Sequence, residues 1–215
     1  MGAILVFDLD GTIAGNYVSF RNTKAIKTIA DIQINPKLLN VLKLADAART
    51  GEKVDAIFLL TNNSDNFYIF MVQYIIGKLV KGVSRAEINA GNGRNIRLYD
   101  LFDDIMSRND NRRPRAPDGN PPKRLIDVQT MVQEAGLPID NLSERTWFFD
   151  DIPDHQIKQE IPANHYIHVN PSYTNGMEED TTNIRDIEAM LTAGGGKKKR
   201  QKTRKTHKLG KKSQV

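Results

Sequence analysis

Four short and mainly apolar runs stand out along the chain, and longer stretches of mixed polarity separate them. The runs are Ala3–Phe7, Ala56–Leu60, Thr146–Phe149 and His165–Val169. Their character is continuous rather than alternating, which is typical of strands buried on both faces of a parallel sheet. We therefore expect four buried strands, and a weaker fifth strand over Leu101–Met106.

The stretches between these runs carry apolar residues at helical spacing. They cover Pro36–Ala48, Asn66–Val80, Lys123–Ala135 and, near the end, Thr181–Leu191. Gly136 and Pro138 end the third of them, as expected where a helix stops. Strands that alternate with helices predict an α/β fold with a mostly parallel central sheet and helices on both faces.

Two segments fall outside this rhythm. Residues 108–122 are polar and rich in proline, which predicts a loop. Residues 194–215 begin with three glycines and continue with basic residues, so they lack the apolar positions that a core requires. We predict one catalytic domain over residues 1–193 and a disordered basic tail over residues 194–215.

The net charge of +5 conceals an uneven distribution. The tail holds ten of the 31 basic residues and none of the 26 acidic ones, so the remainder carries a net charge of −5. Residues 197–212 could contact nucleic acid or act as a nuclear-import signal, and they could equally be a solvated appendage.

Composition also excludes several kinds of chemistry. The chain has no cysteine, which rules out disulfides, thiolate catalysis and cysteine-bound zinc. Asp8 interrupts the apolar start, as a signal peptide would not allow, and no run has the ~18 apolar residues of a membrane span. We expect an intracellular protein, cytoplasmic or nuclear, that is not secreted and does not contact membranes.

Polar side chains follow three of the apolar runs directly. They are Asp8-Leu9-Asp10-Gly11-Thr12, Thr61-Asn62-Asn63 and Asp150-Asp151. In a parallel sheet these groups converge at the carboxyl edge, where ligands bind. Converging carboxylates repel one another, and a hard divalent cation such as Mg²⁺ with oxygen ligands removes that cost. A solvated Asp-Gly turn is the alternative for the first group taken alone.

The spacing of Asp8 and Asp10 adds detail. Residues two apart in an extended chain point the same way, so both carboxylates can face one substrate while Leu9 packs away from it. Gly11 permits a sharp departure from the strand, and the Thr12 hydroxyl can tie down the turn.

These residues resemble the haloacid dehalogenase-like (HAD) superfamily. Phe7-Asp8-Leu9-Asp10-Gly11-Thr12 resembles its first motif, and Leu59-Leu60-Thr61-Asn62-Asn63 resembles the second. Lys123, which follows two prolines, resembles the third-motif lysine, and Phe148-Phe149-Asp150-Asp151 resembles the acidic fourth motif. The motifs stand in the family's order within residues 1–151. The resemblance implies a Rossmann-like fold and a Mg²⁺-dependent phosphatase of phosphomonoesters.

The resemblance also assigns roles. Asp8 would be the nucleophile that forms an aspartyl-phosphate, and Asp10 would be the general acid and base. Thr61 would bind the transferring phosphoryl group, and Lys123 would neutralise the charge that develops on it.

The metal, Mg²⁺, would be held by Asp8, Asp10 (through its carbonyl), Asp150 and Asp151. The sequence leaves open which residue of the acidic pair is the main ligand. It also leaves open whether a nearby arginine takes the role of Lys123. The competing residues are Arg108, Arg112, Arg113, Arg115 and Arg124.

Spacing between the motifs limits the size of any cap. Residues 13–35 leave space for a flap, so we predict a capless or nearly capless enzyme. An open site admits a phosphorylated substrate that could be macromolecular, either a phosphoprotein or a nucleic-acid end. The alternative is a catalytically weak HAD-fold module that binds nucleic acid through its basic tail. A P-loop kinase is not expected, because the chain has no GxxxxGK[ST] sequence.

Overall fold

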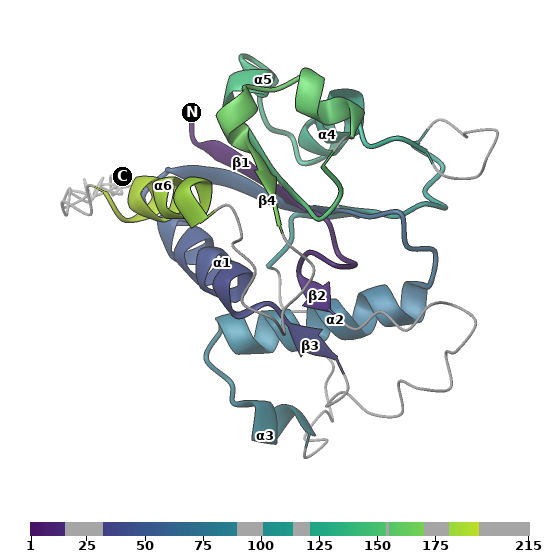
Figure 1. Ribbon diagram of the computed structural model, residues 1–215, viewed down its shortest axis with the longest axis vertical. Coiled ribbons are helices and arrows are strands. Elements are labelled where there is room, and N and C mark those ends of the chain that lie inside the picture. The colour runs from purple at the N-terminus through teal and green to yellow at the C-terminus, as the bar shows by residue number, and fades with distance from the viewer. Residues whose placement is uncertain (16–31, 90–100, 114–120, 154, 170–180, 194–215) are drawn as a thin grey trace, which may run out of the picture.

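A five-stranded, all-parallel sheet forms the centre of the molecule in the computed structural model (Figure 1). The structure describes residues 1–15, 32–89, 101–113, 121–153, 155–169 and 181–193. The strand order is β5-β4-β1-β6-β7. The strands are β1 (Ala3–Phe7), β4 (Val54–Leu60), β5 (Asp104–Met106), β6 (Thr146–Asp150) and β7 (Tyr166–His168). The predicted α/β class with a mostly parallel sheet is thus confirmed.

The first strand lies in the middle of this sheet. Ile4 of β1 pairs with Ala56 of β4 on one side and with Thr146 of β6 on the other. All five residues of β1 are buried, which explains why its apolar character is continuous. The chain extends the sheet from β1 toward β5 first and adds β6 and β7 to the opposite side afterwards.

Helices cover both faces of the sheet (Figure 1). On one face lie α1 (Pro36–Arg49), α2 (Asn66–Val80) and α6 (Thr181–Thr192), packed on alternate strand residues such as Phe7 and Phe149. On the other face α4 (Leu125–Glu134) packs on the intervening residues, among them Phe148. The alternation of side chains therefore divides the core into two layers.

Several boundaries differ from those predicted. The helix expected from Lys123 begins at Leu125, because the Asp127 carboxylate accepts a hydrogen bond from the backbone N–H of an extended Arg124. The strand expected from Leu101 starts at Asp104, because Asp103 uses its side chain and backbone to bind the main chain of Ile57.

The hydrophobic pattern did not predict several short elements. They are the two-stranded pair β2 (Ala14–Gly15) and β3 (Gln33–Ile34), the helices α3 (Arg85–Asn89) and α5 (Leu142–Arg145), and short 3-10 turns at Gln156–Gln159 and Ala163–His165. The predicted tail, much of the predicted flap and the centre of the 108–122 loop lie outside the described residues. Within the described ranges, no helix combines the length and the apolar character needed to cross a bilayer.

The two-layer core yields a stability prediction. Phe149 is fully buried and stacks on Phe7 with ring centroids 4.4 Å apart, whereas Phe67 is 73% exposed. Phe149→Ala should lower the free energy of unfolding by about 3–5 kcal/mol, because it leaves a cavity. The control Phe67→Ala should change it by less than about 0.5 kcal/mol. Urea titration followed by circular dichroism measures both values, and equal losses would contradict the assigned core.

Candidate active site

The carboxyl ends of three neighbouring strands bring the candidate residues together. Asp8 follows β1, Thr61 follows β4, and Asp150 is the last residue of β6. Because the three strands are parallel and adjacent, these residues share one edge of the sheet. Asp8, Thr61 and Asp150 are all buried.

Lys123 joins the two buried carboxylates. Its Nζ lies 2.6 Å from Oδ1 of Asp8 and 2.7 Å from Oδ2 of Asp150, and only 2% of its side chain is exposed. Burial alone would lower the pKa of Lys123, but the two carboxylates raise it above its usual value. Burial raises the pKa of Asp8, against the opposing effect of Lys123. The lysine is therefore a fixed positive charge beside Asp8.

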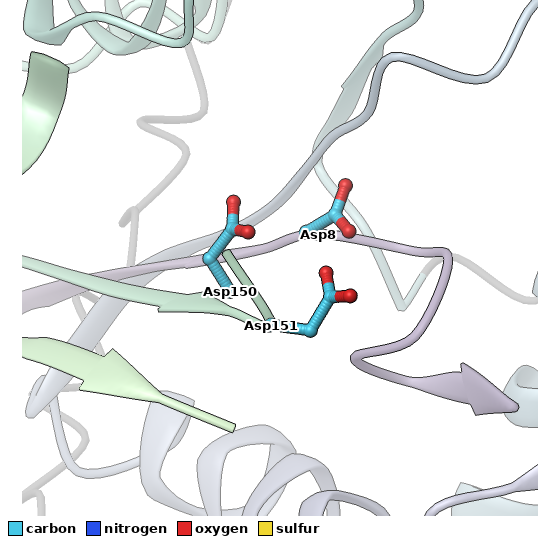
Figure 2. A group of neighbouring side chains, drawn as sticks. All are labelled: Asp8, Asp150 and Asp151. Carbon is cyan, nitrogen blue, oxygen red and sulfur yellow. The ribbon is translucent and has the colours of Figure 1, made fainter. Parts of the chain in front are cut away.

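Asp151 completes a group of three carboxylates. One carboxylate oxygen from each of Asp8, Asp150 and Asp151 can be chosen so that the three atoms lie within 4.8 Å of one another. Figure 2 shows their carboxylates gathered at the ends of β1 and β6. Burial, followed by repulsion from Asp8 and Asp150, raises the pKa of Asp151 to about 6. Three carboxylates against one lysine leave an excess of negative charge, which a divalent cation would balance.

The two residues of the acidic pair, Asp150 and Asp151, have different surroundings. Both oxygens of Asp150 have partners within the protein, since Oδ2 binds Lys123 and Oδ1 accepts the N–H of Ile152. Asp151 is less buried, and its Oδ1 lies 3.4 Å from the Thr12 hydroxyl. The carboxylate of Asp151 is thus the more available of the two for an external ligand.

The turn after β1 fits closely against Asp151. Gly11 has a φ of 78°, and a Cβ at this position would lie 2.3 Å from Oδ2 of Asp151. Any larger residue would be strained and would displace the carboxylate. The Thr12 hydroxyl also lies 3.4 Å from Oδ2 of Asp8, so this turn contacts both acidic groups.

Asp10 is oriented by a different set of partners. The side-chain amide of Asn63 donates to both oxygens of Asp10, at 3.1 and 3.0 Å, and the Thr61 hydroxyl lies 3.5 Å away. Burial and then the charge of Asp8 raise the pKa of Asp10 to about 7, and Asn63 opposes that rise. A carboxyl with this pKa can give up or accept a proton near neutral pH.

Arg113 connects the end of β4 to the segment before Lys123. Its guanidinium donates to the Thr61 carbonyl at 3.2 Å, to Oδ1 of Asn62 at 2.9 Å and to the Pro121 carbonyl at 3.1 Å. Its side chain is almost completely buried and lies 3.7 Å from the Asp127 carboxylate. One cation thus fixes two of the segments that carry the candidate residues.

All the residues selected from sequence meet at this edge, although they form two subgroups. Asp8, Lys123, Asp150 and Asp151 form one, while the Asp10 side chain lies with Thr61 instead. Among the competing arginines that are described, none replaces Lys123 between the two carboxylates. Arg112 pairs with acidic side chains, Arg113 binds backbone carbonyls and Arg124 lies near Glu160.

Two residues that contact the candidate site were not selected from the sequence. Asn63 was noted only as part of a motif, although it stands two residues after Thr61 and so could share its direction. His155 is the second of these residues, and its Nε2 lies 3.6 Å from Oδ2 of Asp150. Burial and the charge of Lys123 lower the pKa of His155 to about 4, so it is neutral at pH 7. Arg115, one of the arginines considered as an alternative to Lys123, lies outside the described residues.

Comparisons of the chain with protein-family models, with curated proteins and with solved structures gave no match. The residues at this edge of the sheet are therefore the basis on which a function can be proposed.

The contact between Lys123 and Asp8 can be tested without any assumption about activity. Lys123→Met should lower the free energy of unfolding by about 3–5 kcal/mol, because it leaves buried carboxylates without their cation. The double variant Lys123→Met/Asp8→Asn should recover part of that loss, since one of these charges is then removed. Chemical denaturation at pH 7 in a chelating buffer measures the free energy of unfolding of the wild type, of each single variant and of the double variant, which together form a double-mutant cycle. Strictly additive effects would show that the two side chains do not interact.

Proposed function

We propose that this protein is a Mg²⁺-dependent phosphatase that hydrolyses phosphomonoesters through an aspartyl-phosphate on Asp8. The observation that carries the proposal is the pairing of Asp8 with a buried lysine 2.6 Å away, beside a second carboxyl, Asp10, that is held separately. A carboxylate nucleophile needs such an environment, in which positive charge is fixed where the phosphoryl oxygens will lie.

The donor set fits Mg²⁺. Asp8, Asp150 and Asp151 supply only oxygen ligands, and their excess negative charge matches a divalent cation. Of the acidic pair, Asp151 would be the main ligand, because Asp150 is more buried and both of its oxygens have protein partners. Mg²⁺ at this position would neutralise charge on the phosphoryl oxygens and on the attacking carboxylate.

In the first step, an Asp8 oxygen attacks phosphorus and the ester P–O bond breaks. The leaving oxygen takes a proton from Asp10, whose pKa of about 7 leaves a substantial protonated fraction at neutral pH. The Thr61 hydroxyl and the Lys123 ammonium stabilise the oxygens of the transferring group. The products of this step are the free alcohol and a phosphorylated Asp8.

In the second step, water attacks the phosphorus of the aspartyl-phosphate. The Asp10 carboxylate, now deprotonated, accepts a proton from that water, and the bond from phosphorus to the Asp8 oxygen breaks. Inorganic phosphate leaves, and Asp8 and Asp10 return to their starting states. The amide of Asn63 supports both steps, since it keeps Asp10 aligned while its protonation changes.

The family assignment belongs to the same proposal. The order of the four motifs along residues 1–151 and the parallel sheet that places them at one edge support membership of the HAD superfamily. A minimal cap is also proposed, since the insertion after the first motif begins and ends in the small β2–β3 pair. A small cap leaves the site open to bulky phosphomonoesters.

The nucleophile is tested by replacing Asp8. Asp8→Asn keeps the shape of the side chain but removes the attacking oxygen, so hydrolysis of p-nitrophenyl phosphate should fall at least about a thousandfold. Asp10→Asn should slow turnover by roughly 10²- to 10⁴-fold, since general acid–base catalysis is lost. Initial rates with Mg²⁺ measure both. Turnover at the wild-type rate by Asp8→Asn would refute the covalent mechanism.

The metal site is tested by two changes with one expected result. Asp151→Asn removes a ligand charge, and Gly11→Ala displaces the same carboxylate without removing it. Each should raise the Mg²⁺ concentration for half-maximal activity roughly tenfold or more. The exposed Asp140→Asn serves as the control and should leave that concentration unchanged. Full activity of the wild-type protein in a strong chelator would contradict the proposed metal.

A further inference from the structure

Arg108 lies beside the part of the site that handles the leaving group. It follows β5 at the carboxyl edge of the sheet, and its backbone N–H donates to the carbonyl of Asn63 at 3.2 Å. The side chain of Asn63 in turn holds Asp10. Because Asp10 is the proposed donor of a proton to the leaving oxygen, the backbone of Arg108 is bound to the residue that positions this donor.

The side chain of Arg108 has no acidic partner among the described residues. It is half-buried, and its Nε is inaccessible to solvent without a hydrogen-bond acceptor. The neighbouring carboxylates are bound elsewhere, because Arg112 pairs with Asp104, Asp110 and Glu134. No hydrogen bond or ion pair of the described residues engages the guanidinium of Arg108, so its terminal N–H groups are available to an anionic ligand.

A second arginine, Arg113, lies near enough to repel the positive charge of Arg108. Burial lowers the pKa of Arg113, three acidic neighbours raise it, and the positive charge of Arg108 lowers it further. The two guanidinium groups therefore repel each other. Arg113 is offset by Asp127, 3.7 Å away, whereas Arg108 has no such counter-charge in the described part of the chain. An incoming oxyanion would supply one.

We propose that Arg108 binds a second anionic group, carried by the leaving group of the substrate. The preferred substrates are then phosphomonoesters with another phosphate or a carboxylate beyond the ester oxygen. A guanidinium matches both groups, because its planar N–H donors can bind two oxygens of one oxyanion. This inference rests on the proposed phosphatase activity and names the substrate class of the same site.

The test compares matched aryl phosphates. Phenyl phosphate has one anionic group, 3-carboxyphenyl phosphate adds a carboxylate, and 1,3-phenylene bisphosphate adds a phosphate. For each enzyme variant, the measured quantity is kcat/KM for a doubly anionic ester divided by kcat/KM for phenyl phosphate. A general loss of activity or folded protein cancels in this ratio, and differences in intrinsic reactivity cancel between variants.

Arg108→Gln should lower the ratio roughly tenfold or more for at least one of the two added groups, mainly through a higher KM, as expected for the loss of a charge-assisted hydrogen bond. Arg108→Lys should restore part of it. Arg185→Gln removes an exposed charge on α6 and should leave the ratio at the wild-type value. Whichever added group responds more strongly identifies the phosphate or the carboxylate as the preferred anion.

The possible failures are distinguishable. If the wild-type protein hydrolyses all three esters and Arg108→Gln does not change either ratio, the role of Arg108 is refuted while the phosphatase activity stands. If the ratio falls equally in Arg185→Gln, the effect is one of net charge, and the local site is refuted as well. If the wild-type protein hydrolyses none of the esters with Mg²⁺, the proposed function fails and this inference fails with it.

Discussion

A lysine buried between two carboxylates is the interaction on which the arrangement of this site depends. Lys123 contacts Asp8 and Asp150 at 2.6 and 2.7 Å in a region closed to solvent. Removing any one of the three charges leaves the others in a medium that solvates them poorly. The geometry of the strand ends, the turn after β1 and the segment before α4 all have to satisfy this contact.

The backbone around Lys123 shows how the chain meets that requirement. Lys123 lies ahead of α4 rather than within it, and the extended Arg124 carries the chain into the helix. The carbonyls of Pro121 and Pro122 accept hydrogen bonds from Arg113, which also binds the Thr61 carbonyl. The position of the lysine is thus determined by β4 and by a second buried cation, as well as by its two carboxylate partners. The contacts of Arg113 are with the protein itself, but they hold Thr61 and the segment before Lys123, which belong to the proposed site.

The sequence predicted the sheet and the convergence of the candidate residues at one edge of it, because both depend on strong local patterns. Fully buried strands leave continuous apolar runs, and Ala3–Phe7 and Asn66–Val80 agree with the predicted boundaries. The helix was predicted to start at Lys123, two residues too early. Its start is set by the hydrogen bond between Arg124 and Asp127, and Lys123 is held ahead of it by Asp8 and Asp150, which are distant in the sequence. The amide of Asn63 and the guanidinium of Arg113 were not predicted as positioning groups for the same reason. Their partners, Asp10 and the carbonyl of Thr61, are distant in the sequence.

The central place of β1 in the sheet has a consequence for the order in which the chain becomes structured. Ile4 is synthesised long before Thr146, with which it pairs in the sheet. Until that later segment has been made, one edge of an apolar strand stays unpaired, and closing so long a loop is slow. Asp8 and Asp150 lie on the two strands that meet in this late step. The nascent chain therefore passes through a stage in which most of its helices can form while Asp8 and Asp150 are still apart, because β1 and β6 have not yet paired with each other.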